Sequence, residues 1–75
     1  MTNNDILRRL RYALDLSEAQ MVAIFDLGGQ TVTEPQACAF MISEDDEGAQ
    51  LCTDQIFGGF LDGLIIDRRG PPPAG

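Results

Sequence analysis

Apolar residues recur along the chain every three or four positions, the spacing that places them on one face of an α-helix. Four segments show this pattern, and each is preceded by a residue that can cap a helix. No run alternates apolar and polar residues for long enough to predict a strand. The pattern predicts an all-α fold, a compact bundle of four short helices with no sheet, over about residues 4–15, 18–27, 34–42 and 54–67.

The starts of these segments carry specific capping signals. Ser17 and Thr33 are each followed three positions later by glutamine, as in a capping box. Thr53 can cap the last helix, and Asn3 or Asn4 is expected to cap the first. The four helix starts are therefore predicted from side chains that accept a backbone hydrogen bond.

The last segment has the widest apolar surface. Its apolar residues cover about half the circumference, more than the roughly 100° of an ordinary surface helix. We expect this helix to be the centre of the core, or to serve the core and an interface together. Gly59 and Gly63 lie roughly opposite the centre of the arc. They either let another backbone approach or are glycines tolerated at exposed positions. The arc consists of Ile56, Phe57, Phe60, Leu61, Leu64 and Ile65.

The composition is that of one small globular domain. Of 75 residues, 44% are hydrophobic and 23% are charged, which distinguishes the chain from a disordered one. We expect a single helical domain over residues 1–70 with a thin margin of stability. Residues 71–75 are proline-rich and are expected to form a disordered tail or a linker.

The charge narrows the range of partners. The chain has twelve acidic residues and five arginines, with no lysine or histidine, so its formal net charge is −7. This charge repels nucleic-acid phosphates and anionic lipids on average, so nucleic acid is disfavoured and no membrane contact is expected. The N-terminus lacks the apolar stretch of a secretory signal, and no apolar run approaches the roughly 20 residues of a membrane span. We therefore expect a cytoplasmic protein.

Few residues offer catalytic chemistry. Without histidine, Cys38 and Cys52 lack the usual partner of a cysteine nucleophile, and they do not form a CxxC pair. Both are expected to be small, buried, reduced thiols. No spacing singles out two carboxylates for acid–base work. We expect no enzyme activity, no catalytic residue, no cofactor and no small-molecule substrate.

The acidic run in the middle of the chain has an alternative interpretation. With Gly48 at the sixth position of a calcium-binding loop, Ser43, Asp45, Glu47 and Asp54 take four ligand positions. The first ligand is normally aspartate and the last a bidentate glutamate, so the match fails at both ends. The run favours a solvated acidic turn and no metal site.

A helix-turn-helix is the second alternative, because the two middle segments are joined through a pair of glycines. A recognition helix needs polar and basic side chains, yet residues 34–41 offer one glutamine and no cation. The phosphate contacts would then come from the first segment. A nucleic-acid-associated regulator is the alternative function, and its candidate contacts are Arg8, Arg9 and Arg11.

These three arginines lie off the apolar face of the first segment. Part of their charge is expected to be neutralised within the helix. Asp5 precedes Arg9 by four positions, and Arg11 precedes Asp15 by four, the spacing of helical ion pairs.

Five stretches of the chain together reach from Asn3 to Gly70: NNDILRRLRYAL, IFDLGG, EDDEG, the Cys52-x-Asp54 step and FLDGLIIDRRG. With these stretches the chain resembles one copy of the repeat in the YehS-like family of bacterial proteins of unknown function. Members usually carry two such copies, with a basic residue before the acidic run and an aromatic after its glycine, where this chain has Ser43 and Ala49. The resemblance implies no activity.

The two-copy habit of the family suggests how this chain assembles. If the copies pack on each other in relatives, a lone copy leaves that face bare, and a second chain can cover it as a homodimer. The rival explanation is a fragment whose partner copy has been lost. We expect a non-enzymatic interaction module, self-associating or adaptor-like. Its candidate interface is Tyr12, Phe57, Gly59, Phe60, Gly63 and Leu64.

Overall fold

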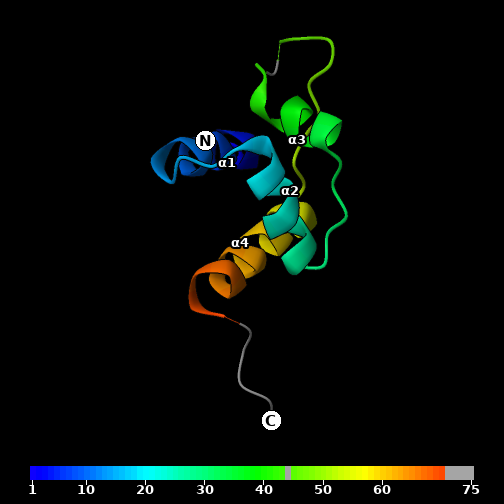
Figure 1. The fold of residues 1–75 in the computed structure, drawn as a ribbon. Helices are drawn as coiled ribbons and strands as arrows, with labels where there is room; N and C mark the ends of the chain where they lie inside the picture. Colours follow the sequence, from blue (N-terminus) through cyan, green and yellow to red (C-terminus); the bar gives the residue numbers. More distant parts are fainter. Residues whose placement is uncertain (44, 71–75) are drawn as a thin grey trace.

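Four helices form the structure, a computed structural model that describes residues 1–43 and 45–70 (Figure 1). The all-α prediction is confirmed, and no strand occurs among these described residues. The expected tail, residues 71–75, and Glu44 of the acidic run lie outside the described residues. The helices are α1 (Asn3–Ala13), α2 (Glu18–Leu27), α3 (Glu34–Met41) and α4 (Asp54–Arg69).

Side-chain caps start three of the helices as the sequence predicts. Ser17 Oγ accepts the Gln20 N–H, while Gln20 accepts the Ser17 N–H at 2.7 Å, which completes the capping box of α2. Thr33 caps α3 in the same way with its own glutamine, and Thr53 accepts the Ile56 N–H at the start of α4. These caps satisfy amide donors that the first turn of a helix leaves without partners.

The cap of α1 differs from the prediction. Thr2 Oγ1 accepts the Asp5 N–H at 3.1 Å, and Asp5 Oδ2 accepts the Thr2 N–H at 3.0 Å. Neither Asn3 nor Asn4 caps the helix, because both side chains bond to the segment that leads into α4. The Thr-x-x-Asp spacing is the signal that would have found this cap.

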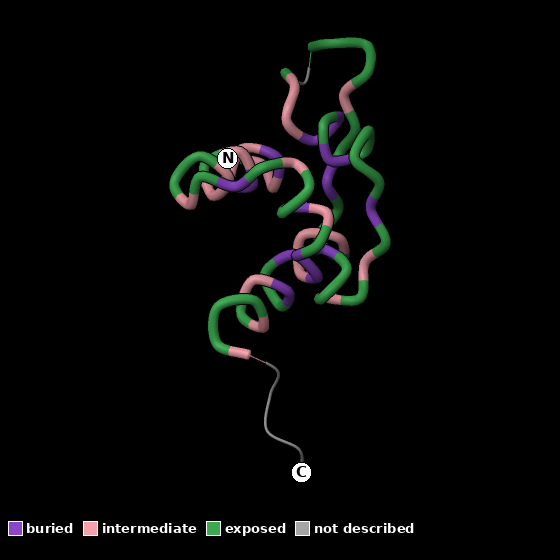
Figure 2. Tube along the Cα trace, in the orientation of Figure 1, coloured by how far each residue is buried: buried purple, intermediate pink, exposed green. Residues whose placement is uncertain are grey.

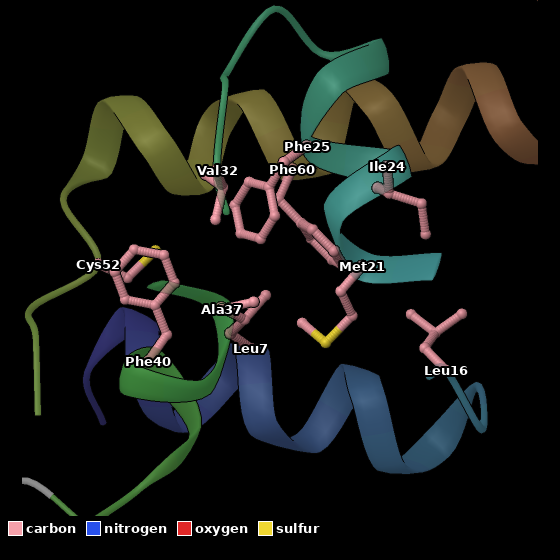
Figure 3. Close-up of a cluster of buried hydrophobic side chains, with 10 residues drawn as sticks. All are labelled: Leu7, Leu16, Met21, Ile24, Phe25, Val32, Ala37, Phe40, Cys52 and Phe60. Carbon is pink, nitrogen blue, oxygen red and sulfur yellow. The ribbon is translucent and has the colours of Figure 1, made fainter. Parts of the chain in front are cut away.

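The core is organised around Phe25 of α2 (Figure 3). Its ring lies 5.0 Å from that of Phe60 on α4 and 6.0 Å from that of Phe40 on α3, in tilted geometries that aromatic pairs favour. The expected centre, α4, contributes Phe60 to this cluster, whereas α2 packs against both α3 and α4. Completing the buried cluster are Leu7, Leu16, Met21, Ile24, Val32, Ala37 and Cys52.

Helices α2 and α4 meet almost backbone to backbone. A Cβ atom on Gly28 would lie 1.6 Å from the carbonyl oxygen of Gly59, and one on Gly63 would lie 1.8 Å from that of Ile24. No side chain fits at these distances, so glycine is required at this crossing. The glycine spacing in α4 thus serves packing within the protomer.

Candidate functional site

Helix α4 has a buried side and an exposed side (Figure 2). Three residues spaced i, i+3 and i+7 face away from α2: Gly58, Leu61 and Ile65. At 3.6 residues per turn they fall within about 60° of one another. Leu61 is 39% exposed and Ile65 is 57% exposed, and a Cβ atom on Gly58 would meet open space. We call this stripe the outer face of α4.

The candidate interface residues divide between the two sides of the protomer. Gly59, Phe60 and Gly63 are buried against α2, so they offer no surface to a second chain. Phe57 and Leu64 are half-buried and pack against the core. Gly59 and Gly63 do lie where another backbone comes close, but that backbone is α2 of the same protomer.

One candidate interface residue lies apart from α4. Tyr12, on α1, is 87% exposed, so its ring lies in solvent.

Charged residues flank the outer face of α4 in its C-terminal half. Asp62, Arg68 and Arg69 are all exposed. Arg68 Nε lies 3.7 Å from Asp67 Oδ2, an exposed contact that contributes little to stability. Both arginines also lie at the negative end of the helix dipole, where cations are favoured.

The arginines of α1 are arranged differently from the predicted i, i+4 pairs. Arg8, not Arg9, pairs with the Asp5 carboxylate, and it also donates to the carbonyl of Ile42 at 2.9 Å. Arg9 donates instead to the Asp5 backbone oxygen at 3.2 Å. The predicted pair of Arg11 is also absent among the described residues, where Arg11 Nε is buried without a hydrogen-bond partner.

This arrangement weakens the nucleic-acid alternative. Arg8 is committed to Asp5 and to the Ile42 carbonyl, and part of the Arg11 guanidinium is buried. The six residues from Gly28 to Thr33 separate α2 from α3, more than the 3–4-residue turn of a helix-turn-helix. The geometry of the described helices thus favours none of them as a recognition helix for the DNA major groove.

Asn4, one of the two caps predicted for the first helix, instead joins three segments of the fold. Asn4 is 1% exposed. Its Nδ2 donates to the carbonyls of Gln50 at 2.7 Å and Phe40 at 3.3 Å, and its Oδ1 accepts the Cys52 N–H at 2.8 Å. An isolated asparagine in a polar first turn carries no sequence signal of this role. Asn4 fixes the segment before α4 against α1 and α3.

The two thiols occupy different environments. Cys52 is buried, as expected, and burial raises its pKa to about 11. Cys38 is exposed, so its predicted burial is wrong: it faces outward on a helix that buries Ala37 and Phe40. Its Sγ lies 3.1 Å from Glu18 Oε1, and this hydrogen bond raises its pKa. A raised pKa lowers the thiolate fraction, so neither thiol is activated as a nucleophile.

Neither a metal cluster nor a membrane helix is found in the described part of the chain. Residues 1–43 and 45–70 contain no group of three acidic or cysteine side chains placed to hold a metal ion. Among the same residues, no helix is both long and apolar enough to cross a membrane.

Comparison with known proteins assigns the chain to a family. The model of a protein family of unknown function, DUF1456, matches residues 3–70, which is nearly the whole of the described chain. The chain belongs to the DUF1456 family. The match includes the four helices and both sides of α4.

The chain also has a longer relative. The uncharacterized protein YehS of Escherichia coli strain K12 is 41% identical over 70 residues, which cover 93% of this chain and 45% of YehS. The chain therefore spans less than half the length of that relative. No solved structure matches the chain.

Proposed function

We propose that this domain is a non-enzymatic interaction module of the cytoplasm that self-associates as a homodimer. The observation that carries the proposal is the exposed apolar pair Leu61 and Ile65 on the outer face of α4. Phe60, the residue next to Leu61, is buried in the core, so both sides of this helix carry apolar side chains. A rigid helix that is anchored on one side can present such a pair to a partner without reorganisation.

The length of the relative supports the proposal. The 70 aligned residues are 45% of YehS, which leaves room there for a second domain of similar size. In a protein with two such domains, one domain can cover the outer face of the other, and two copies of this domain can make the same contact. Two domains linked in one chain are held at a high effective concentration, so the linked contact is stronger than the same contact between separate molecules.

Light scattering across a concentration series tests the proposal. The chain has a mass of 8.2 kDa, so a dimer doubles a small and well-defined value. We expect the average mass to rise from monomer toward dimer as concentration increases. Starting from low ionic strength, added salt should strengthen association, since it screens the repulsion between two chains of net charge −7. A constant monomer mass up to millimolar concentration would contradict self-association.

A further inference from the structure

We infer that two copies dock through antiparallel α4 helices, with a twofold axis at Ile65 and with Asp62 of each copy paired with Arg69 of the other. The inference deepens the proposed self-association and rests on it. It names one occupant for the outer face of α4, a second copy of the same surface. The apolar pair and the distribution of charge around it carry the argument.

The positions of the charges around the stripe favour this pairing. Asp62 and Arg69 are seven residues apart, so they lie within about 20° of each other on one flank of the outer face. A twofold axis perpendicular to the helix keeps this flank on the same side in both copies. When the second helix runs antiparallel to the first and the two cross at Ile65, Arg69 of the second copy lies level with residue 61 of the first. It is then one residue, about 1.5 Å along the helix axis, from Asp62 of the first copy.

The same symmetry brings the apolar residues together. Ile65 lies on the axis and contacts Ile65 of the second copy, the most exposed apolar residue of α4 against itself. Leu61 lies under the aliphatic stem of Arg69 of the second copy, a stem that covers apolar surface while its charge remains in water. Each protomer thus uses its own cation to cover the partner's leucine and to neutralise the partner's carboxylate.

A parallel pairing lacks these features. With both helices in the same direction, Arg68 and Arg69 would lie beside the identical residues of the other copy, and the negative helix ends would also coincide. The antiparallel arrangement separates the two arginine pairs and places each beside a carboxylate. In a molecule with twelve acidic residues and five arginines, such local pairing offsets the general repulsion.

The contact is small, which sets the expected strength. Two partly exposed apolar side chains per protomer are fewer than a standard-size interface supplies. We therefore expect a weak dimer, with a Kd of roughly 0.1–1 mM. Charge variants should shift such an equilibrium measurably.

Charge reversal provides the first test. Asp62→Arg places two cations together at each end of the contact, and Arg69→Asp places two anions there. Each single variant should weaken self-association about tenfold, and the double variant Asp62→Arg/Arg69→Asp should restore it. Arg9→Asp on α1, which changes the net charge by the same amount as Arg69→Asp, is the matched control and should leave a larger part of the association intact.

Cross-linking locates the axis. In a Cys38→Ser background, Ile65→Cys places the new thiol beside its own symmetry mate, whereas Gln55→Cys lies ten residues, about 15 Å, from the axis. With oxidised glutathione as the oxidant, Ile65→Cys should form a covalent dimer and Gln55→Cys should remain monomeric. A wild-type dimer that neither cross-links at residue 65 nor responds to charge reversal would overturn this interface and leave self-association standing. A wild-type monomer at every concentration would overturn both.

Discussion

A Cβ atom on Gly63 would lie 1.8 Å from the carbonyl oxygen of Ile24, which makes this glycine part of the α2–α4 packing. The obstructing atom is backbone, so no rotamer change can relieve the clash and the helices must separate. We predict that Gly63→Ala lowers the free energy of unfolding by about 2 kcal/mol or more. Urea denaturation followed by circular dichroism measures the loss, and a variant that does not fold also agrees.

Gly58 provides the matched control on the same helix. A Cβ atom there meets open space, so alanine should gain helix propensity without a clash. Gly58→Ala should therefore raise the free energy of unfolding, by up to about 1 kcal/mol. Equal effects of the two alanine variants would show that α2 and α4 do not cross as described.

Asn4→Ala and Asn3→Ala should differ in their effect on stability. Asn4→Ala removes three hydrogen bonds and leaves the buried Cys52 N–H without its acceptor. The loss should be about 3 kcal/mol, because unsatisfied buried groups bear the full cost of leaving water. Asn3→Ala removes more exposed bonds, to the Cys52 carbonyl and to Asp54, and should cost about 1 kcal/mol or less. Thermal unfolding compares them, and a mild Asn4→Ala variant would contradict its joining role.

Acid should destabilise the α1 cap in a defined pH window. The hydrogen bond from the Thr2 backbone, followed by that from Arg8, lowers the pKa of Asp5 from 3.8 to about 2. The unfolded chain binds this proton first as pH falls, so the stabilising contribution is present above pH 3.8 and is lost toward pH 2.

The prediction is tested by the melting temperature as a function of pH. The wild-type value should fall more steeply through this window than that of Asp5→Asn, which has no carboxyl to titrate. Arg8→Gln removes the second cause of the pKa shift and should give an intermediate slope. Parallel curves for wild type and Asp5→Asn would show that the cap does not hold this carboxylate.

The two cysteines should differ in reactivity. In the native protein an aromatic disulfide reagent should titrate one thiol, Cys38, whereas the buried Cys52 should react after unfolding. Glu18→Gln should speed modification of Cys38, because the hydrogen bond to the Glu18 carboxylate raises the pKa of this thiol. A rate that is unchanged in Glu18→Gln would contradict the Sγ–carboxylate contact.

The features of this fold that are predictable from the sequence are those that local chemistry decides. The caps at Ser17, Thr33 and Thr53 depend on side chains within three residues of the helix start, so spacing alone predicts them. The same is true of the helix boundaries, each of which lies within two residues of its prediction.

The features that are not predictable from the sequence are those that tertiary packing decides. The periodicity of α4 places Gly59 and Gly63 on one side of the helix but cannot say which helix approaches them. Cys38 sits in a helix so short and apolar that spacing does not separate its buried side from its exposed side. Asn4 acts on residues 36–48 positions away, and no local pattern reports partners at that distance.

A dilution series followed by nuclear magnetic resonance tests the central claim, self-association through the outer face of α4, most directly. The backbone amide signals of a chain of 8.2 kDa can be followed residue by residue from about 10 μM to 1 mM, a range that spans the expected Kd. We predict that the amides of residues 58–69 shift progressively with concentration while those of α1 remain in place. Signals that do not move, or shifts confined to another surface, would contradict the claim.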